Sequence, residues 1–172
     1  MTEIPFDRFV FLDFEASGLG PQSWPIELGV SWIAPDLKVH TYSNLVRPSG
    51  DWAEDGWSPE SAAVHGIPRR DLDAAPSVDV VARDFLTILG NRIALSDVPG
   101  LERFWLETLL EAAQLVNTVE IRDFKVTMSK TFSSAVMDHV FAQRTLDGIT
   151  HRAGADSRRL ALLWLAGMQK SD

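Results

Sequence analysis

The chain has 172 residues, of which 45% are hydrophobic, a net charge of −8 and no cysteine. The lack of cysteine excludes disulfides and thiolate metal sites, so carboxylates and histidine must hold any bound metal, which favours a hard ion. The acidic balance argues against an extended nucleic-acid-binding face. We expect one domain over residues 1–172, in the cytoplasm, with no targeting or membrane-spanning segment and no membrane partner.

Charge is distributed unevenly along the chain. Acidic residues dominate residues 1–60, whereas basic residues outnumber acidic ones over residues 144–170. The basic residues of this second segment are Arg144, Arg152, Arg158, Arg159 and Lys170. We therefore expect any nucleic acid to be contacted over a few nucleotides, with phosphate contacts from the C-terminal segment.

The N-terminal half predicts three strands. The first covers residues 8–15, and a glycine-containing loop follows it at residues 16–21. Residues 26–33 and 38–46 have the pattern of two more strands, joined as a hairpin by the short connection between them. A loop rich in Pro, Gly, Asp and Trp leads to a short helical turn at residues 60–65.

The C-terminal half predicts helices that alternate with short strands. Apolar spacing favours helices over residues 78–89, 101–115, 133–144 and 155–168. Short apolar runs favour strands at residues 92–96 and 119–121. Three leading strands followed by this alternation predict an α/β fold, with a mixed five-stranded sheet flanked by helices.

Two carboxylates stand at the end of the first predicted strand. Because side chains alternate along a strand, Asp13 and Glu15 point to the same face. Like charges this close are tolerated in a half-buried position if a cation lies between them or one is protonated, and Mg²⁺ prefers such oxygen ligands. The pair therefore indicates a metal site. Taken alone, it is better explained as two solvated residues on an edge strand.

Two further acids stand at the start of apolar helical faces. Glu102 shares its face with Trp105 and Leu106, and an inward carboxylate needs a partner such as a metal ion. The alternative is that Glu102 is exposed in the first turn, where the helix dipole stabilises it. Asp156 begins the face that carries Leu160, and it could instead be a simple N-terminal capping acid.

Histidines are the candidates for proton transfer. His151 lies in the loop before Asp156, where it could reach a reaction centre and take a proton from water. An isolated histidine of this kind is more often a solvent-exposed loop residue. His65 follows a turn of small residues and is read as structural or substrate-lining. His40 and His139 have no ligand-like neighbours and receive no role.

Three segments, taken in chain order, resemble the three motifs of the DEDDh 3′→5′ exonucleases. These are Asp13-Phe14-Glu15-Ala16-Ser17-Gly18-Leu19, then Glu102 ahead of Trp105-Leu106, then His151-Arg152-Ala153-Gly154-Ala155-Asp156. This family is the proofreading-type, DnaQ-like branch of the ribonuclease H-like fold. The turn Val64-His65-Gly66-Ile67 also looks like a segment of these enzymes. The resemblance extends from about Phe9 to Leu165.

The resemblance implies a two-metal mechanism with Mg²⁺ or Mn²⁺ ions roughly 4 Å apart. Asp13 would bridge both ions, and Glu15 and Asp156 would hold the ion that carries the attacking water. Glu102 would act on the second ion, directly or through bound water. His151 would take the proton from the attacking water.

The resemblance also implies the substrate and its contacts. The substrate would be a 3′ end of single-stranded DNA or RNA, or a short oligonucleotide, and the product a nucleoside 5′-monophosphate. The backbone of Ala16 and Ser17 would lie near the terminal nucleotide, and Leu19 would wedge against its base. His65 would line the substrate.

The second motif departs from the usual pattern of the family. Most relatives have an aspartate at the position of Glu102, after a His-Asn pair that Asp97-Val98 replaces here. Asp97 is therefore the competing ligand. One alternative is a catalytically weakened or inactive ribonuclease H-like module that binds nucleic acid as a scaffold, and another is a ribonuclease H-like endonuclease. The oligomeric state stays open, a homodimer included, because Trp52, Trp57 and the last helix could be core, substrate wall or dimer face.

Overall fold

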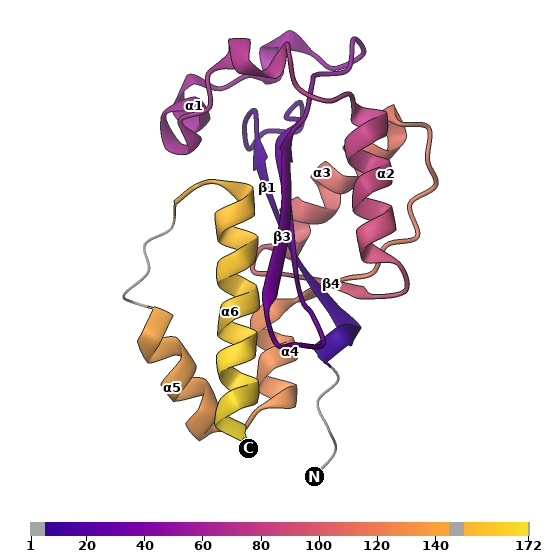
Figure 1. The fold of residues 1–172 in the computed structure, drawn as a ribbon. Coiled ribbons are helices and arrows are strands. Elements are labelled where there is room, and N and C mark those ends of the chain that lie inside the picture. Colours follow the sequence, from indigo (N-terminus) through magenta and orange to yellow (C-terminus); the bar gives the residue numbers. More distant parts are fainter. Residues whose placement is uncertain (1–5, 145–149, 172) are drawn as a thin grey trace.

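The computed structural model describes residues 6–144 and 150–171. Within these ranges a mixed five-stranded sheet has the order β3-β2-β1-β4-β5, in which β1 pairs antiparallel with β2 and parallel with β4 (Figure 1). The strands are β1 (Phe9–Ala16), β2 (Pro25–Ile33), β3 (Val39–Leu45), β4 (Ile93–Ser96) and β5 (Ile121–Asp123). The predicted mixed α/β sheet is confirmed.

Helices cover both faces of the sheet. They are α1 (Pro59–His65), α2 (Val78–Leu89), α3 (Pro99–Ala112), α4 (Phe124–Thr131), α5 (Ser134–Arg144) and α6 (Ala153–Ser171). Single 3-10 turns occur at Phe6–Arg8, Glu54–Gly56 and Arg69–Leu72. Helices α2 and α3 lie on one face, α4 to α6 lie on the other, and α1 lies beyond the end of the sheet where α6 begins (Figure 1).

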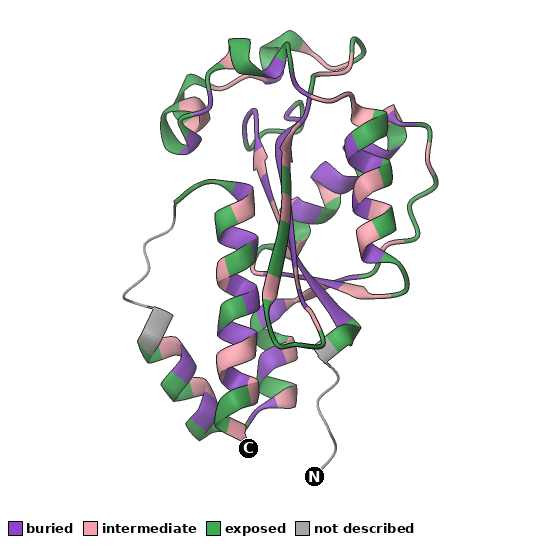
Figure 2. Ribbon diagram, in the orientation of Figure 1, coloured by how far each residue is buried: buried purple, intermediate pink, exposed green. Residues whose placement is uncertain are grey.

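The alternation of side chains along β1 divides the core into two layers. Val10, Leu12 and Phe14 are buried with the apolar faces of α2 and α3, whereas Phe9 and Phe11 are buried against α4 and α6 (Figure 2). The α6-facing row of β1 continues beyond Phe11 as Asp13 and Glu15. The strand therefore places both carboxylates beneath the first turns of α6.

Small residues allow the start of α6 to lie directly on β2. A Cβ on Gly29 would lie 2.1 Å from the carbonyl carbon and oxygen of Ala153, and a Cβ on Gly154 would lie 2.7 Å from Cβ of Ser43. One turn along α6, the hydroxyls of Ser31 and Ser157 are 3.0 Å apart. Glycine is required at this contact because any larger side chain would push the helix off the sheet.

The tryptophans of the long loop after β3 contact a small core. Trp52 stacks on Trp24 with ring centroids 5.6 Å apart, and Trp57 packs on the same ring at 5.9 Å. The guanidinium of Arg69 lies 4.7 Å from the centroid of the Trp24 ring. These contacts place Trp52 and Trp57 against internal residues. The last helix is also core, since Trp164 is fully buried.

The predicted position of the fifth strand was wrong, and α4 was not predicted. The strand expected at residues 119–121 lies at Ile121–Asp123. Asp123 then caps α4, because its side chain accepts a hydrogen bond from the Val126 N–H at 2.8 Å. The β-branched residues and serine of α4 give a weak helical signal, and the burial of Phe124 and Met128 stabilises the helix instead. In the described part of the chain, no helix has the length and apolarity that a membrane crossing requires.

Candidate active site

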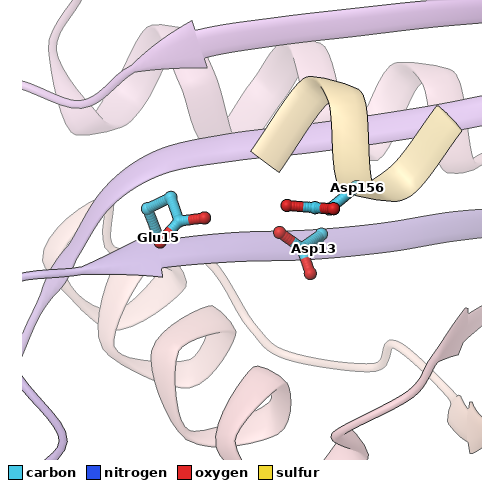
Figure 3. A group of neighbouring side chains, drawn as sticks. All are labelled: Asp13, Glu15 and Asp156. Carbon is cyan, nitrogen blue, oxygen red and sulfur yellow. The ribbon is translucent and has the colours of Figure 1, made fainter. Parts of the chain in front are cut away.

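Three carboxylates from β1 and α6 converge at the end of the sheet. Asp13, Glu15 and Asp156 each offer one oxygen, and these oxygens lie within 4.8 Å of one another. Figure 3 shows the carboxylates turned toward the same small space, two from the strand and one from the first turn of the helix. The structure thus brings together the two outer motifs, which are far apart in the sequence.

Burial and like charge both destabilise the ionised forms of Asp13 and Glu15. The pKa of Asp13 is raised well above its ordinary value by burial, and then by Glu15, Asp156 and Asp97. Burial raises the pKa of Glu15 to about 7, with further contributions from Glu27 and Asp156. Glu27 is the cross-strand partner of Glu15 on β2, and like charges placed directly opposite repel. Such a cluster is stabilised either by protonation or by a bound cation.

Glu102 lies on the other side of β1, with its carboxylate inside the protein. The residue is 2% exposed, so the predicted inward position is confirmed and the exposed alternative is wrong. Oε1 accepts a hydrogen bond from the Phe14 N–H at 3.3 Å, whereas buried Oε2 has no hydrogen-bond partner among the described residues. Burial raises the pKa of Glu102 strongly, and the charge of Asp13 adds to the effect. Glu102 is therefore electrostatically linked to the carboxylate cluster.

Asp97, the competing acid, is paired with a cation. It follows β4, and its Oδ2 lies 3.6 Å from Nη2 of Arg159. The same guanidinium donates from Nε to Oδ1 of Asp156 at 3.4 Å. Of the two acids proposed for the second motif, Glu102 carries the unpaired oxygen and Asp97 is engaged by Arg159.

A buried glutamate that sequence reasoning missed fixes the start of α6. Glu27 is 3% exposed and accepts hydrogen bonds from Arg152 Nε at 2.9 Å and Nη2 at 3.0 Å. It also accepts from the Ala153 N–H at 3.1 Å and from the Ser43 hydroxyl at 3.0 Å. Its signal in the sequence is an acid between two apolar residues of a core strand, which needs a specific partner. Glu27 holds Arg152, and through it the beginning of the helix that carries Asp156.

The two candidate histidines occupy different environments. His151 is exposed just before α6, with a backbone φ of 51°, and it is not part of the carboxylate cluster. His65 is buried, and its Nδ1 accepts a hydrogen bond from the Ile67 N–H at 3.0 Å. Its Nε2 has no hydrogen-bond partner within the described ranges. Burial lowers the pKa of His65, so the ring is neutral near pH 7 and its Nε2 carries the proton.

The loop after β1 contains both buried and exposed candidates for substrate contact. Ala16 and Ser17 are buried. The Ser17 N–H donates to the Trp24 carbonyl, and the Ser17 carbonyl accepts from the Ser58 N–H. Leu19 is 73% exposed, so its apolar side chain is accessible to a ligand.

Three of the arginines expected to contact phosphate make contacts within the protein. Arg158 donates to the Val39 carbonyl at 2.8 Å, Arg152 binds Glu27 and Arg159 binds acids of the site. The side chain of Arg152 remains 51% exposed, and Arg158 is exposed as well. Both residues are therefore accessible to a bound anion.

The donor set fits a hard divalent ion. All the converging ligands are carboxylate oxygens, which Mg²⁺ and Mn²⁺ prefer. The unpartnered Oε2 of Glu102 is a further oxygen donor for which the described residues supply no hydrogen bond. The residues present therefore match the ion chemistry expected from the sequence.

Comparison with known proteins identifies the family of the chain. The exonuclease family model (RNase T type) matches residues 10–163. The PolC-type DNA polymerase III of Thermotoga petrophila is 31% identical over 107 residues, and that of Thermotoga maritima is 29% identical over 107 residues. Each alignment covers 59% of this chain and 8% of the polymerase, so the chain spans a small part of these relatives.

Solved structures share the fold. Exonuclease I of E. coli in complex with a dT13 oligonucleotide aligns with a TM-score of 0.68 at 12% identity, over 91% of this chain and 40% of that one. The zinc-bound form of its complex with single-stranded DNA aligns with a TM-score of 0.69 at 14% identity, over 95% and 40%. The family match and the mixed sheet together show that the chain belongs to the DEDDh-type, DnaQ-like exonuclease family and has its ribonuclease H-like fold.

Proposed function

We propose that this chain is a 3′→5′ exonuclease that hydrolyses the terminal phosphodiester of single-stranded DNA or RNA and releases nucleoside 5′-monophosphates. The observation that carries the proposal is the convergence of Asp13, Glu15 and Asp156 within 4.8 Å. Exonuclease I, which shares the fold, binds single-stranded oligonucleotides in its structures. In this proposal residues 1–172 act as one exonuclease domain.

The proposal assigns two Mg²⁺ or Mn²⁺ ions to the carboxylates. Asp13 would contact both ions, Glu15 and Asp156 would hold one of them, and Glu102 would hold the other through its unpartnered Oε2. Bound in pairs, such ions lower the pKa of a water nucleophile and stabilise the attacking and leaving oxygens of an in-line displacement. The raised pKa values of Asp13 and Glu102 support this assignment, since a cation relieves the repulsion among buried carboxylates.

His151 is assigned the role of general base. It is exposed next to the first turn of α6, and Asp156 lies on that turn. To act, the imidazole must turn from its exposed position toward the carboxylates and accept a proton from the attacking water. Between His151 and Asp156, the Arg152 side chain and the Ala153 N–H both bind Glu27, which holds this segment on β2.

The substrate contacts are assigned to the rim of the site. Exposed Leu19 would pack against the terminal base, a contact that tolerates any sequence. His65 would donate a hydrogen bond from Nε2 to the substrate, and the backbone at Ala16 and Ser17 would form the adjacent wall. Because most nearby arginines are engaged internally, we expect short single-stranded ends rather than long duplexes as substrates.

Degradation of end-labelled oligonucleotides in Mn²⁺ tests the proposal. A 5′-labelled strand should shorten to a ladder, and a 3′-labelled strand should release its label as a mononucleotide at once. Asp13→Asn should lower the rate at least about a hundredfold, because it removes a charged ligand from the cluster. Asp36→Asn, at an exposed aspartate paired with Lys38, is the matched control and should keep the wild-type rate.

Matched DNA and RNA strands in the same assay define the preferred substrate.

The absence of shortening by the wild-type protein, or equal rates for wild type and Asp13→Asn, would contradict the proposal. Cuts inside a circular single strand would point to the endonuclease alternative instead.

A second candidate function is a nucleic-acid-binding scaffold that has lost turnover. A specific observation favours it: the guanidinium of Arg159 occupies a position among the acids that would hold the ions. Calorimetric titration with Mn²⁺ separates the two functions. Ion and oligonucleotide binding without product formation would support the scaffold, whereas product formation would exclude it.

A further inference from the structure

Arg159 is a nearly buried cation inside the acid cluster. Its side chain is 11% exposed and lies one turn after Asp156 on α6. Nε lies 3.4 Å from Oδ1 of Asp156, and Nη2 lies 3.6 Å from Oδ2 of Asp97. The guanidinium therefore connects the first turn of α6 with the end of β4.

The charge of Arg159 lies beside a proposed ligand of the site, because Asp156 belongs to the group of three acids with Asp13 and Glu15. Arg152 is bound to Glu27 on the β2 side. The two arginines thus act on different ends of the carboxylate cluster.

A guanidinium in this position has two physical consequences. It is always charged and makes directional contacts with carboxylates, so it stabilises the clustered acids when no metal ion is present. It also repels an incoming cation, because charges interact strongly where little water separates them. Arg159 and a divalent ion therefore compete to neutralise the same acids.

We propose that Arg159 is a positioning residue that serves as a built-in counter-ion: it engages Asp97 and Asp156 and weakens the binding of the divalent ion assigned to Asp156. This inference rests on the proposed function, since it concerns the ions assigned there. It predicts two ions bound with unequal affinity. It also explains why Asp97, which Arg159 engages, does not bind an ion, whereas Glu102 can bind one.

Ion binding and thermal unfolding test the inference without measuring activity. Arg159→Gln should lower Tm in EDTA by several degrees, because the clustered acids lose their counter-ion. It should also tighten the weaker Mn²⁺ site by about tenfold, as judged from the Coulomb energy of one removed charge. The rise of Tm on adding Mn²⁺ should consequently be larger than in the wild type, since tighter binding stabilises the folded state more.

Two further variants serve as controls. Arg158→Gln removes the neighbouring arginine, which contacts the Val39 carbonyl and not the acids, and it should keep wild-type Mn²⁺ affinity. Arg159→Lys keeps the charge and should restore the weaker Mn²⁺ site toward wild-type affinity. If Arg159→Gln does not fold in EDTA, Arg159→Met removes the charge without adding a polar group, and the same prediction applies.

The outcomes separate this inference from the proposed function. Mn²⁺ binding that is unchanged or weaker after loss of the Arg159 charge would overturn the inference and leave the exonuclease proposal intact. Equal Mn²⁺-induced shifts of Tm in Arg159→Gln and Arg158→Gln would overturn it as well. A wild-type protein that binds no Mn²⁺ would overturn the proposed function and the inference together.

Discussion

The acids that α6 and α3 contribute to the candidate site differ in their hydrogen bonding. On the α6 side, both carboxylate oxygens of Asp156 accept hydrogen bonds, one from the Arg152 N–H at 3.3 Å and one from Arg159. On the α3 side, Glu102 has one oxygen bonded to the Phe14 N–H and the other unpartnered among the described residues. Both oxygens of Asp156 thus have hydrogen-bond donors within the protein, whereas one oxygen of Glu102 has none among the described residues.

The difference follows from how each helix begins. The start of α6 is held on β2 by Glu27, by the serine pair and by the glycine contact at Gly29. Helix α3 begins at Pro99 without a side-chain cap, and Glu102 enters the core within its first turns. A carboxylate buried in this way costs free energy that only a cation or a proton can offset. The start of α6 is therefore the more tightly held of the two, and α3 carries the carboxylate oxygen that the described residues leave without a donor.

The largest effect should come from breaking the α6 contact. In Gly29→Ala, the new Cβ would lie 2.1 Å from the Ala153 carbonyl and 2.5 Å from the Gly154 nitrogen, so the backbone must separate. We expect the free energy of unfolding to fall by about 3 kcal/mol, measured by urea denaturation. Mn²⁺ affinity should fall with it, because Asp156 moves with the helix.

Gly50→Ala is the matched control for the α6 contact. A Cβ there meets nothing within 4 Å, and we expect a change within about 0.5 kcal/mol. If Gly29→Ala were as stable as this control and bound Mn²⁺ normally, the close approach of α6 to β2 would not hold the site.

The next effect tests the α3 side. Under the proposed function, Glu102→Gln should lower kcat about a hundredfold, equivalent to about 2.7 kcal/mol of transition-state stabilisation, because it removes the charge assigned to the second ion. Asp97→Asn should lower kcat less than about tenfold, because Arg159 already engages that carboxylate. A greater loss in Asp97→Asn than in Glu102→Gln would identify Asp97 as the ligand and reverse the comparison.

The smallest expected effect is a loss of folding stability with rising pH, caused by Glu15. The pKa of Glu15 is about 7 in the folded protein against an ordinary value of 4.5, so the folded state binds more protons than the unfolded state between these pH values. The stability that this group contributes is present below pH 4.5 and is lost as pH rises through 7. In EDTA we expect Glu15 to lower the free energy of unfolding by about 2 kcal/mol over this pH range. This loss is smaller than the full difference in pKa implies, because solvent screens a partly exposed carboxyl.

Urea unfolding from pH 4.5 to 7.5 measures this loss. Glu15→Gln should remove the share of the decline that Glu15 causes, and Mn²⁺ should flatten the wild-type profile because it favours the carboxylate. A wild-type stability in EDTA that rises over this range would show that the acids are already neutralised without an ion.

Patterns along the sequence determined the fold class and half of the site. The run from Phe9 to Leu12 followed by Asp13 and Glu15 fixes which face each side chain takes, because strand alternation is a local property. The apolar spacing of residues 78–89 likewise predicts α2 with the observed bounds. Helical periodicity aligned Glu102 and Asp156 with apolar faces, but it left open whether Glu102 is exposed and whether Asp156 is only a capping acid.

Only the tertiary structure decided how these acids are neutralised. The burial of Glu27 against Arg152 and the pairing of Arg159 with Asp97 join residues that are distant in sequence. Packing also leaves one oxygen of Glu102 without a hydrogen-bond partner among the described residues. Local periodicity shows which face a side chain occupies and leaves open what it meets there. Charge pairing depends on distances of a few ångströms across packed elements, and packing sets those distances.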